Sequence, residues 1–544
     1  MRKSHFPGLA AVVLVVAAVI LFLPSRPAMK RELGPDSPWI RALQPETAVA
    51  DLAKFKDAPL YRYELTYDPE AHLLSGTNKI LYTNLSGRPL DTLYLAVSAR
   101  TWGDAKNEDD RFSISDLRVD GAPHQHTMHP HGVTIPLERT LAPGKSVTLS
   151  FGMRATLPRT AVVTSGSRDY PSSGGLYGYN PGYADGLDAA LPLVVGDDDA
   201  SERIEKGVGF FYRPSLFDLR ITLPAAWQVI SSGTTVSETP AEGDRTTARV
   251  VGLGLRFGLY VSRTFESVSA QAGQTRVTCY FPANQRGAVQ GILADAVQAL
   301  ATNQALLGPH PYPEMKLFPA LAVGSVAGMN VAGGLIVLSA SAYSPPPALV
   351  PPSFTDPFLR KALSAAEFSR QQILFHEAAH SWWGHLVLSD MVKQPLWAEG
   401  LTEATAIAAV ERARGQEDAD RYRTWASLRY QHFRRVGYAD LPVGLPVPDP
   451  LRISDYMAMS YSKPALFYDR VRQQMGDGAF WRAVRGYIDA NRFTMKTDRG
   501  PVEALIAADP AVEALYRRWL MEAHGDEDLG VLTDDQAKAL GLSK

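Results

Sequence analysis

The spacing of apolar residues in this chain changes near residue 270, and this change limits the folds that are open to it. Between residues 58 and 268 apolar and polar residues alternate, as they do from Tyr61 to Tyr67 and from Val147 to Phe151. Such a period of two is typical of β-strands. After residue 275 helical spacing takes over, and from Leu363 onward nearly every segment has a helical pattern. The pattern predicts an N-terminal all-β antiparallel domain followed by an α+β domain that ends in helices.

Length and composition agree with a globular protein of several domains. The chain has 544 residues, too many for one compact core, and its 45% of hydrophobic and 21% of charged residues exclude a disordered chain. We divide it into an N-terminal segment (1–28), a linker (29–57), a β-domain (58–268), a second domain (269–528) and a C-terminal tail (529–544).

Net charge and cysteine content exclude two classes of function. The 55 Lys and Arg against 57 Asp and Glu give a net charge of −2. Nucleic acid is therefore not an expected partner, because binding to phosphates needs a clustered basic excess. Cys279 is the only cysteine of the sequence. A single cysteine excludes an internal disulfide framework and a zinc site built from cysteines.

A short apolar run lies at the N-terminus, where Arg2 and Lys3 precede 15 apolar residues from Leu9 to Leu23. As a helix the run extends about 22 Å, which is short for a hydrocarbon core of about 30 Å. A cleaved signal peptide and an uncleaved anchor both fit, and the lack of a small-x-small cleavage site favours the anchor. We expect residues 1–28 to tether the protein to a membrane, with the rest exported to a periplasmic or extracytoplasmic space. If the segment is cleaved, the protein is secreted.

Residues 376–380 read His-Glu-Ala-Ala-His. On a helix His376 and His380 are one turn apart, so both imidazoles leave the same face and can share one zinc ion. Glu377 lies beside them and is placed to act as a general base toward water. Apolar neighbours such as Phe375 and Trp382 indicate a buried helix, where unpaired histidines are unfavourable. The segment therefore predicts a metal site rather than a surface helix.

A further ligand follows on the next predicted helix, where Glu399 lies 19 positions beyond His380. Two histidines and one glutamate leave a fourth position open, which is typical of catalytic zinc sites. The sequence predicts one Zn²⁺ per chain. Glu403, one turn beyond Glu399, is placed to accept a hydrogen bond from Nδ1 of a ligand histidine, and a solvated carboxylate is the alternative.

At these residues the chain resembles a known family. His376-Glu-Ala-Ala-His380-Ser-Trp-Trp-Gly with Leu396-Trp-Ala-Glu399-Gly is similar to the gluzincin aminopeptidases of the membrane alanyl aminopeptidase type, including the spacing to Glu399. Weaker similarity extends over residues 58–525. The resemblance implies a thermolysin-like zinc-peptidase domain over 269–528, in a short form without the family's large C-terminal helical domain. It also implies that Tyr461, in Tyr461-Ser-Lys-Pro-Ala465, stabilises the transition state.

One stretch departs from the family. Where the family has Gly-x-Met-Glu-Asn, with the Glu binding the substrate α-amine, this chain has Gly328, Met329 and Asn330. A neutral amide cannot make a charge-assisted bond to an ammonium group. We expect a membrane-tethered zinc metallopeptidase that acts on N-terminal segments of peptides or proteins with altered amine recognition, and cleavage within chains remains open. The alternatives are a catalytically weak zinc-bound peptide-binding or assembly protein, and a hydrolase of a non-peptide substrate.

Overall fold

The structure is a computed structural model. It describes residues 29–97, 111–157, 184–195, 212–320, 328–343, 366–389, 396–444, 457–496 and 499–542. The described residues from 33 to 542 belong to one compact unit. The apolar run Leu9–Leu23, on which the predicted tether depends, lies outside the described residues. Among the residues that are described, no helix has the length and apolar composition needed to cross a membrane.

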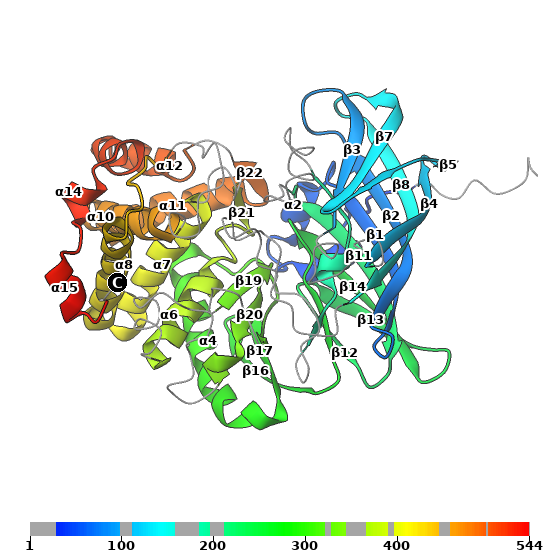
Figure 1. Ribbon diagram of the computed structural model, residues 1–544, viewed down its shortest axis with the longest axis horizontal. Coiled ribbons are helices and arrows are strands. Elements are labelled where there is room, and N and C mark those ends of the chain that lie inside the picture. The colour runs from blue at the N-terminus through cyan, green and yellow to red at the C-terminus, as the bar shows by residue number, and fades with distance from the viewer. Residues whose placement is uncertain are drawn as a thin grey trace, which may run out of the picture. The chain divides into compact units, whose positions relative to one another are not determined.

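An eight-stranded sheet makes up the largest part of the β-domain (Figure 1). Its order is β13 (Thr234–Ala241), β14 (Arg245–Gly254), β11 (Ser215–Pro224), β1 (Leu60–Asp68), β2 (Leu73–Thr83), β8 (Ser146–Thr156), β4 (Phe112–Val119) and β5 (Ala122–Pro123). Neighbouring strands are antiparallel except β1 and β11, which run parallel. The structure differs from the expected antiparallel order at this pair, because alternation along a strand carries no information on its direction.

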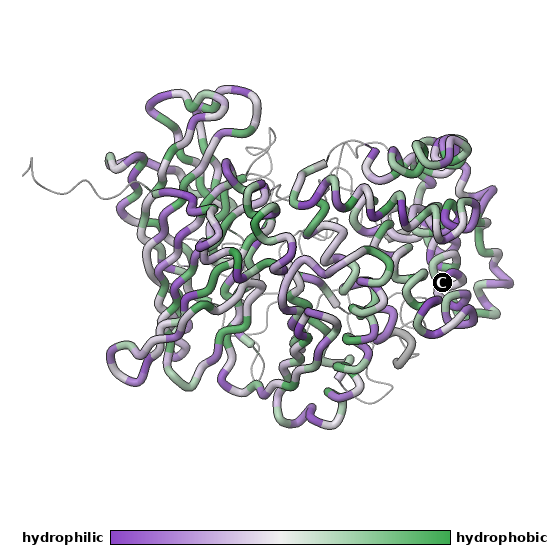
Figure 2. Tube along the Cα trace, turned by 180° about the vertical axis from the view of Figure 1, so that it is seen from behind, coloured by the Kyte–Doolittle hydropathy of each residue, from purple (hydrophilic) through white to green (hydrophobic). Residues whose placement is uncertain are grey.

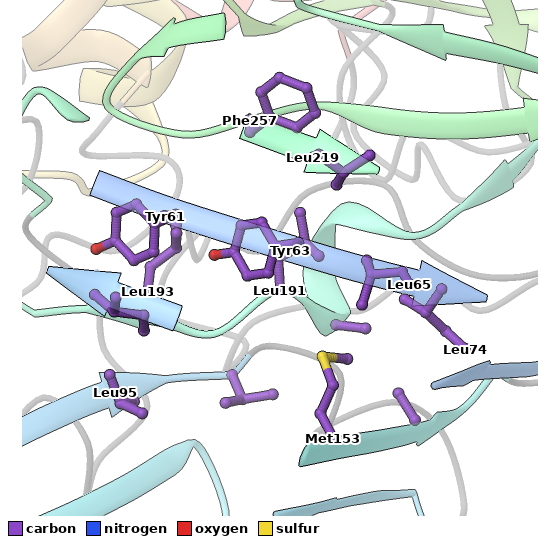
Figure 3. Close-up of a cluster of buried hydrophobic side chains, with 14 of the residues drawn as sticks. Tyr61, Tyr63, Leu65, Leu74, Leu95, Met153, Leu191, Leu193, Leu219 and Phe257 are labelled. Carbon is purple, nitrogen blue, oxygen red and sulfur yellow. The ribbon is translucent and has the colours of Figure 1, made fainter. Parts of the chain in front are cut away.

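Two smaller sheets complete the β-domain. They have the orders β10 (Leu193–Val194), β3 (Leu90–Ala96), β7 (Gly132–Leu141), β6 (Thr127–His129), and β12 (Gln228–Ser231), β15 (Leu259–Ser262), β9 (Asp185–Gly186). The alternating residues Tyr61, Tyr63 and Leu65 are buried in the core, and Figure 3 shows them in a row along β1. Hydrophobic and hydrophilic stretches alternate along the strands (Figure 2). Burial of one face of each strand is what the period of two predicts.

A five-stranded mixed sheet begins the second domain. Its order is β16 (Phe265–Ala272), β17 (Thr275–Pro282), β18 (Glu314–Ala320), β20 (Leu335–Ser339) and β19 (Gly328–Ala332). The predicted domain boundary at 268/269 falls inside β16, which pairs with β17. Cys279 lies buried on β17, and burial raises the pKa of its thiol to about 12. Strand β19 is antiparallel to β20 and forms one edge of this sheet.

Helices pack beside this sheet and make up most of the described residues that follow it (Figure 1). They are α4 (Arg286–Leu307), α6 (Ala366–Ala379), α7 (Leu396–Arg414), α8 (Gln416–Arg435), the π-helical turn η7 (Met457–Ser462), α10 (Lys463–Met475), α11 (Asp477–Asn491), α12 (Val502–Ala508), α13 (Val512–Tyr516), the π-helical turn η8 (Arg517–Met521), α14 (Gly525–Leu529) and α15 (Asp534–Ala539). The strand β21 (Val387–Ser389) follows α6, and it pairs in parallel with β22 (Thr494–Lys496), which follows α11. Although the sequence has a helical pattern from Leu363 onward, α6 ends at Ala379, and a turn leads to β21.

The segment predicted to be a linker is packed. It contains the 3-10 helix η1 (Pro38–Ala42) and α2 (Ala48–Ala53). The indole of Trp39 is buried and donates to the carbonyl oxygen of Phe217 in the β-domain at 2.8 Å. Asp51 accepts two hydrogen bonds from Arg492, which follows α11. The difference arises because the apolar residues of this segment lack a regular period, although several of them, such as Trp39, Leu52 and Phe55, are buried.

The C-terminal residues are also packed rather than forming a free tail. Thr533 begins α15 with a capping box, in which its side chain and that of Gln536 each accept the other's main-chain N–H. Leu532, Ala537 and Leu542 are buried against side chains of α8. The segment therefore belongs to the helical part of the second domain.

Candidate active site and metal centre

The helix α6 carries His376 on its last turn and is followed directly by His380. Leu374 and Phe375 are buried, so the segment is fixed in the core next to the polar residues that follow. His376 lies inside α6, and His380 directly after it, where its N–H still donates to the carbonyl of His376 at 3.2 Å. The two Nε2 atoms are 3.1 Å apart. The i, i+4 spacing thus brings both imidazoles to one point, as the sequence predicts.

Glu399 reaches the same point from the first turn of α7. Its Oε2 lies 3.4 Å from Nε2 of His376 and 3.3 Å from Nε2 of His380. Ligand atoms bound to one zinc at about 2.0–2.1 Å and tetrahedral angles are separated from each other by about 3.3 Å. The three separations therefore fit three corners of a zinc tetrahedron, and within the described residues this is the one group of His, Cys, Asp or Glu with metal-ligand geometry.

The outer nitrogens of both histidines are held by the chain. Nδ1 of His376 lies 2.8 Å from Oε2 of Glu403, and Nδ1 of His380 lies 3.0 Å from the carbonyl oxygen of Trp383. A carboxylate and a carbonyl accept at these positions, so Nδ1 carries a proton and Nε2 is the nitrogen that remains for a metal. Nε2 is the atom that faces Glu399, and this tautomer is the one that a metal requires.

The carboxylates around His376 change its ionisation. Burial lowers the pKa of His376, but hydrogen bonds to Glu399 and Glu403 outweigh burial and raise the pKa to about 10. Burial also raises the pKa of Glu403, yet Arg429 and His376 together lower it to about 2. Because a zinc ligand must be deprotonated, binding of the metal displaces the proton that this cluster otherwise holds.

Glu377 is held between α6 and the edge strand β19. Its Oε2 accepts from the main-chain N–H of Asn330 at 2.7 Å, and burial raises the pKa of its carboxyl group, against the effect of His376 and His380. A raised pKa suits a group that first accepts a proton and then returns it. Gly328 allows this approach, because a Cβ there would lie 2.6 Å from Ile373 and 3.4 Å from Cγ of Glu377.

Asn330 is held against α6 by its side-chain amide group. Its Nδ2 donates to the main-chain carbonyl of Glu377 at 2.9 Å and lies 3.5 Å from Oγ of Ser381. The side chain is buried and directed at α6. Asn330 therefore holds β19 against α6, and Met329 lies among apolar residues that include Val331 and Phe318.

Tyr461 lies in the π-helical turn η7. Its ring stacks on that of His376, with 5.6 Å between the centroids and 15° between the planes. The turn is packed closely against α7, because a Cβ on Gly400 would lie 2.5 Å from Pro464 and 3.3 Å from the carbonyl oxygen of Ser460. Gly400 follows the ligand Glu399 directly, so the residues on either side of Tyr461 pack against the turn of α7 that bears Glu399. π-Helical turns are rare and are frequent at functional sites.

Three residues of the site were not singled out in the sequence. Tyr422 donates to Oε2 of Glu403 at 2.8 Å, Arg429 donates to its Oε1 at 2.7 Å, and Thr402 lies 3.2 Å from Nδ1 of His380. Tyr422 and Arg429 are seven residues apart, so they lie on one face of α8 two turns apart. This spacing could identify the two residues as partners of Glu403 only if the position of Glu403 in the fold were already known.

The comparison with known proteins agrees with this geometry. The sequence of residues 358–519, which includes the ligands, Glu377 and Tyr461, matches the peptidase family M1 domain. The chain carries a peptidase family M1 domain. This is a domain of zinc metallopeptidases, and His376, His380 and Glu399 are the residues in it that would hold Zn²⁺. No curated protein matches the chain.

Solved structures with M1 domains are similar to the fold. The M1 zinc metallopeptidase from Deinococcus radiodurans is 17% identical, with a TM-score of 0.59 over 85% of this chain and 94% of that chain. A mutant of it bound to a Tyr-Ser-Ala substrate is 16% identical, with a TM-score of 0.58 over 86% and 95%. A two-domain M1 zinc metallopeptidase mutant bound to L-tryptophan is 18% identical, with a TM-score of 0.57 over 86% and 94%. The fold is thus that of a two-domain M1 peptidase, a β-rich domain followed by the M1 domain.

Proposed function

We propose that the protein is a zinc-dependent peptidase that removes residues from the N-terminal segments of peptides. The observation that carries this proposal is the set of three ligand atoms, 3.1–3.4 Å apart, next to the buried carboxylate of Glu377. Zinc, when bound, supplies a Lewis acid and makes a bound water more acidic. Glu377 accepts the proton of the attacking water and passes it to the leaving amine, while the Tyr461 phenol donates to the developing oxyanion.

Short peptides are the proposed substrate class. One similar structure is described as bound to a Tyr-Ser-Ala substrate, and two others as bound to L-tryptophan and to L-arginine. A tripeptide and single amino acids are what an enzyme that removes N-terminal residues takes in and releases. The same class of substrate fits this chain because its ligands and general base have the geometry described above.

Recognition of the substrate α-amine is proposed to be weak. The edge strand β19 reads Gly-Met-Asn-Val-Ala and offers no carboxylate. An acid opposite an ammonium group contributes a charge-assisted hydrogen bond of about 1.5–3 kcal/mol, which corresponds to about a 10- to 100-fold preference. We therefore expect a free N-terminus to be favoured over an acetylated one by less than about tenfold.

The experiment uses free and N-acetylated peptide libraries, with and without a chelator. Hydrolysis is expected to stop on removal of the metal and to return on addition of Zn²⁺. His380→Ala is expected to lose most of the one zinc per chain, whereas Glu377→Gln keeps zinc and loses turnover. His524→Ala, which removes a histidine outside the zinc cluster, is the control and keeps both. Full zinc occupancy in His380→Ala would contradict the assignment, and zinc without hydrolysis would favour a peptide-binding protein.

We also propose that the N-terminal segment anchors the protein in a membrane and that the M1 domain works outside the cytoplasm. The support is the basic start and the apolar run Leu9–Leu23. Full-length protein is expected to stay with membranes after a carbonate wash and to keep its Met1 end. A soluble mature form that begins near residues 26–30 would show that the segment is a cleaved signal.

A further inference from the structure

Arg429 of α8 connects two parts of the site that come from distant segments of the chain. Its side chain is 2% exposed. Nη2 donates to Oε1 of Glu403 at 2.7 Å, and Nε donates to Oγ of Ser462 at 2.7 Å. One guanidinium group thus joins the carboxylate that holds His376 to the residue that directly follows Tyr461.

The carboxylate of Glu403 has donors on both oxygens. Oε2 lies 2.8 Å from Nδ1 of His376 and 2.8 Å from the hydroxyl of Tyr422, while Oε1 accepts from Arg429. Its side chain is 3% exposed, so water does not compete for these bonds. The direction of the Glu403 carboxylate, and with it the direction of the His376 ring, therefore depends on Arg429.

The ring of Tyr461 has the same two neighbours. The guanidinium carbon of Arg429 lies 5.4 Å from the centroid of this ring, and the His376 ring stacks at 5.6 Å. Arg429 also lies over the ring of Trp425 at 4.1 Å, which fixes the plane of the guanidinium group. The planar guanidinium group has donors in fixed directions, so it can bind Glu403 and Ser462 at the same time. A lysine ammonium group lacks this geometry.

We propose that Arg429 is a positioning residue that sets the phenol of Tyr461 relative to the metal ligand His376. The proposal rests on the proposed function, because it assumes that Tyr461 donates to the oxyanion. Arg429 acts through the hydrogen bond to Ser462 on one side and through Glu403 on the other. Its hydrogen bonds go to Ser462 and Glu403 and not to the three predicted metal ligands.

Kinetic measurements with and without the Tyr461 hydroxyl test the connection from Arg429 through Ser462 to Tyr461. Arg429→Lys is expected to lower kcat by about 10- to 100-fold with less than about a threefold change in KM, because a small displacement of a group that acts in the transition state reduces kcat. In a Tyr461→Phe background the same substitution is expected to lower kcat by less than about threefold. Ser462→Ala, which removes only the hydroxyl acceptor, is expected to show the same pattern with a smaller loss, and it serves if Arg429→Lys fails to fold.

The matched control is Arg472→Lys. Arg472 is equally buried, with 6% of its side chain exposed, and it pairs with Glu411, Asp469 and Asp477 away from the zinc ligands. Its replacement is expected to change kcat by less than about twofold in both backgrounds. An equal loss for Arg429→Lys with and without the Tyr461 hydroxyl would show a purely structural role and overturn the proposal, as would an unchanged kcat.

Cobalt spectroscopy tests the connection from Arg429 through Glu403 to His376, and it requires no catalytic turnover. In the Co²⁺-loaded protein, Arg429→Gln is expected to shift the visible absorption bands and to weaken cobalt binding by about tenfold or more, because substitutions behind a ligand histidine have effects of that size. Arg472→Gln is expected to leave both unchanged. If the unmodified protein hydrolyses no peptide, the proposed function fails, whereas an unchanged cobalt spectrum in Arg429→Gln overturns the positioning role itself.

Discussion

Asp185 shows how burial changes a single side chain outside the metal site. It lies on β9, is 4% exposed and accepts a hydrogen bond from the hydroxyl of Tyr67 at 2.6 Å. Burial raises the pKa of its carboxyl group from 3.8 to about 6, although the Tyr67 hydroxyl and the charge of Arg263 act in the opposite direction. Asp185 therefore loses its proton less readily in the folded protein than in the unfolded chain.

This shift predicts how stability depends on pH. Because the pKa is higher in the folded than in the unfolded chain, the contribution of Asp185 is complete below about pH 4 and is lost as the pH rises through about 6. Two pKa units correspond to about 3 kcal/mol, so Asp185→Asn is expected to raise the free energy of unfolding at pH 7.5 by up to about that amount. The gain is expected to shrink toward pH 4.5 in urea unfolding. The exposed Asp244→Asn serves as control, and a gain independent of pH would contradict the prediction.

The helix α7 packs closely against η7 and α10. α7 contributes a metal ligand, and η7 contributes the phenol opposite to it. Gly400 lets the two elements approach, since an added Cβ meets the ring of Pro464 at 2.5 Å. A ring in a helix's first turn cannot move aside as a flexible side chain can, so any larger residue separates the elements.

Gly400→Ala is therefore expected to lower both stability and turnover. Alanine favours a helix over glycine by about 1 kcal/mol, but overpacking costs about 1–3 kcal/mol and is expected to dominate. The control is Gly486→Ala in α11, where nothing lies within 4 Å of the added Cβ. This variant is expected to be stabilised by up to about 1 kcal/mol with unchanged kcat. Measurement of urea midpoints and kcat for both variants checks the comparison; equal behaviour of the two glycines would disprove the role of close packing.

At the scale of the whole molecule, residues 38–55 join the β-domain to the second domain. Trp39 donates to the carbonyl of Phe217, and Gln44 donates to the carbonyl of Tyr312 at 2.8 Å. Asp51 and Arg492, which lie 441 positions apart, form a bidentate ion pair. Their side chains are 2% and 11% exposed, respectively. A buried pair of this kind keeps the segment in place even though the segment has little regular structure.

Loss of one partner of this pair is expected to be costly. Arg492→Ala leaves the Asp51 carboxylate buried and unpaired, so a loss of about 3–5 kcal/mol in the free energy of unfolding is expected. The double variant Arg492→Ala with Asp51→Ala is expected to lose less than the sum of the single variants. Arg421→Ala, whose pair with Glu417 is exposed, is the control and is expected to cost less than about 1 kcal/mol. Additive losses at positions 51 and 492 would contradict the coupling.

Local pattern explains which features could be predicted from the sequence. The i, i+4 histidines and the alternation from Tyr61 to Tyr67 along β1 are properties of neighbouring residues, and both were predicted. The partners of Trp39 and Asp51 lie 178 and 441 positions away, so no local pattern shows that residues 38–55 are packed. Arg429 is one of several arginines on α8, and only the folded arrangement shows that it is the one that pairs with Glu403. The direction of Asn330 depends in the same way on the packing of β19 against α6.

The buried position of Cys279 has a practical consequence for measuring motion in this protein. Its thiol is inside the sheet with a pKa near 12, so maleimide reagents are expected to leave it unmodified in the folded protein. Because it is the sole cysteine of the sequence, a pair of cysteines introduced at exposed positions can carry spin labels or fluorophores without further changes to the chain. One such label on the β-domain and another on α11 report the distance between the two domains, with and without peptide.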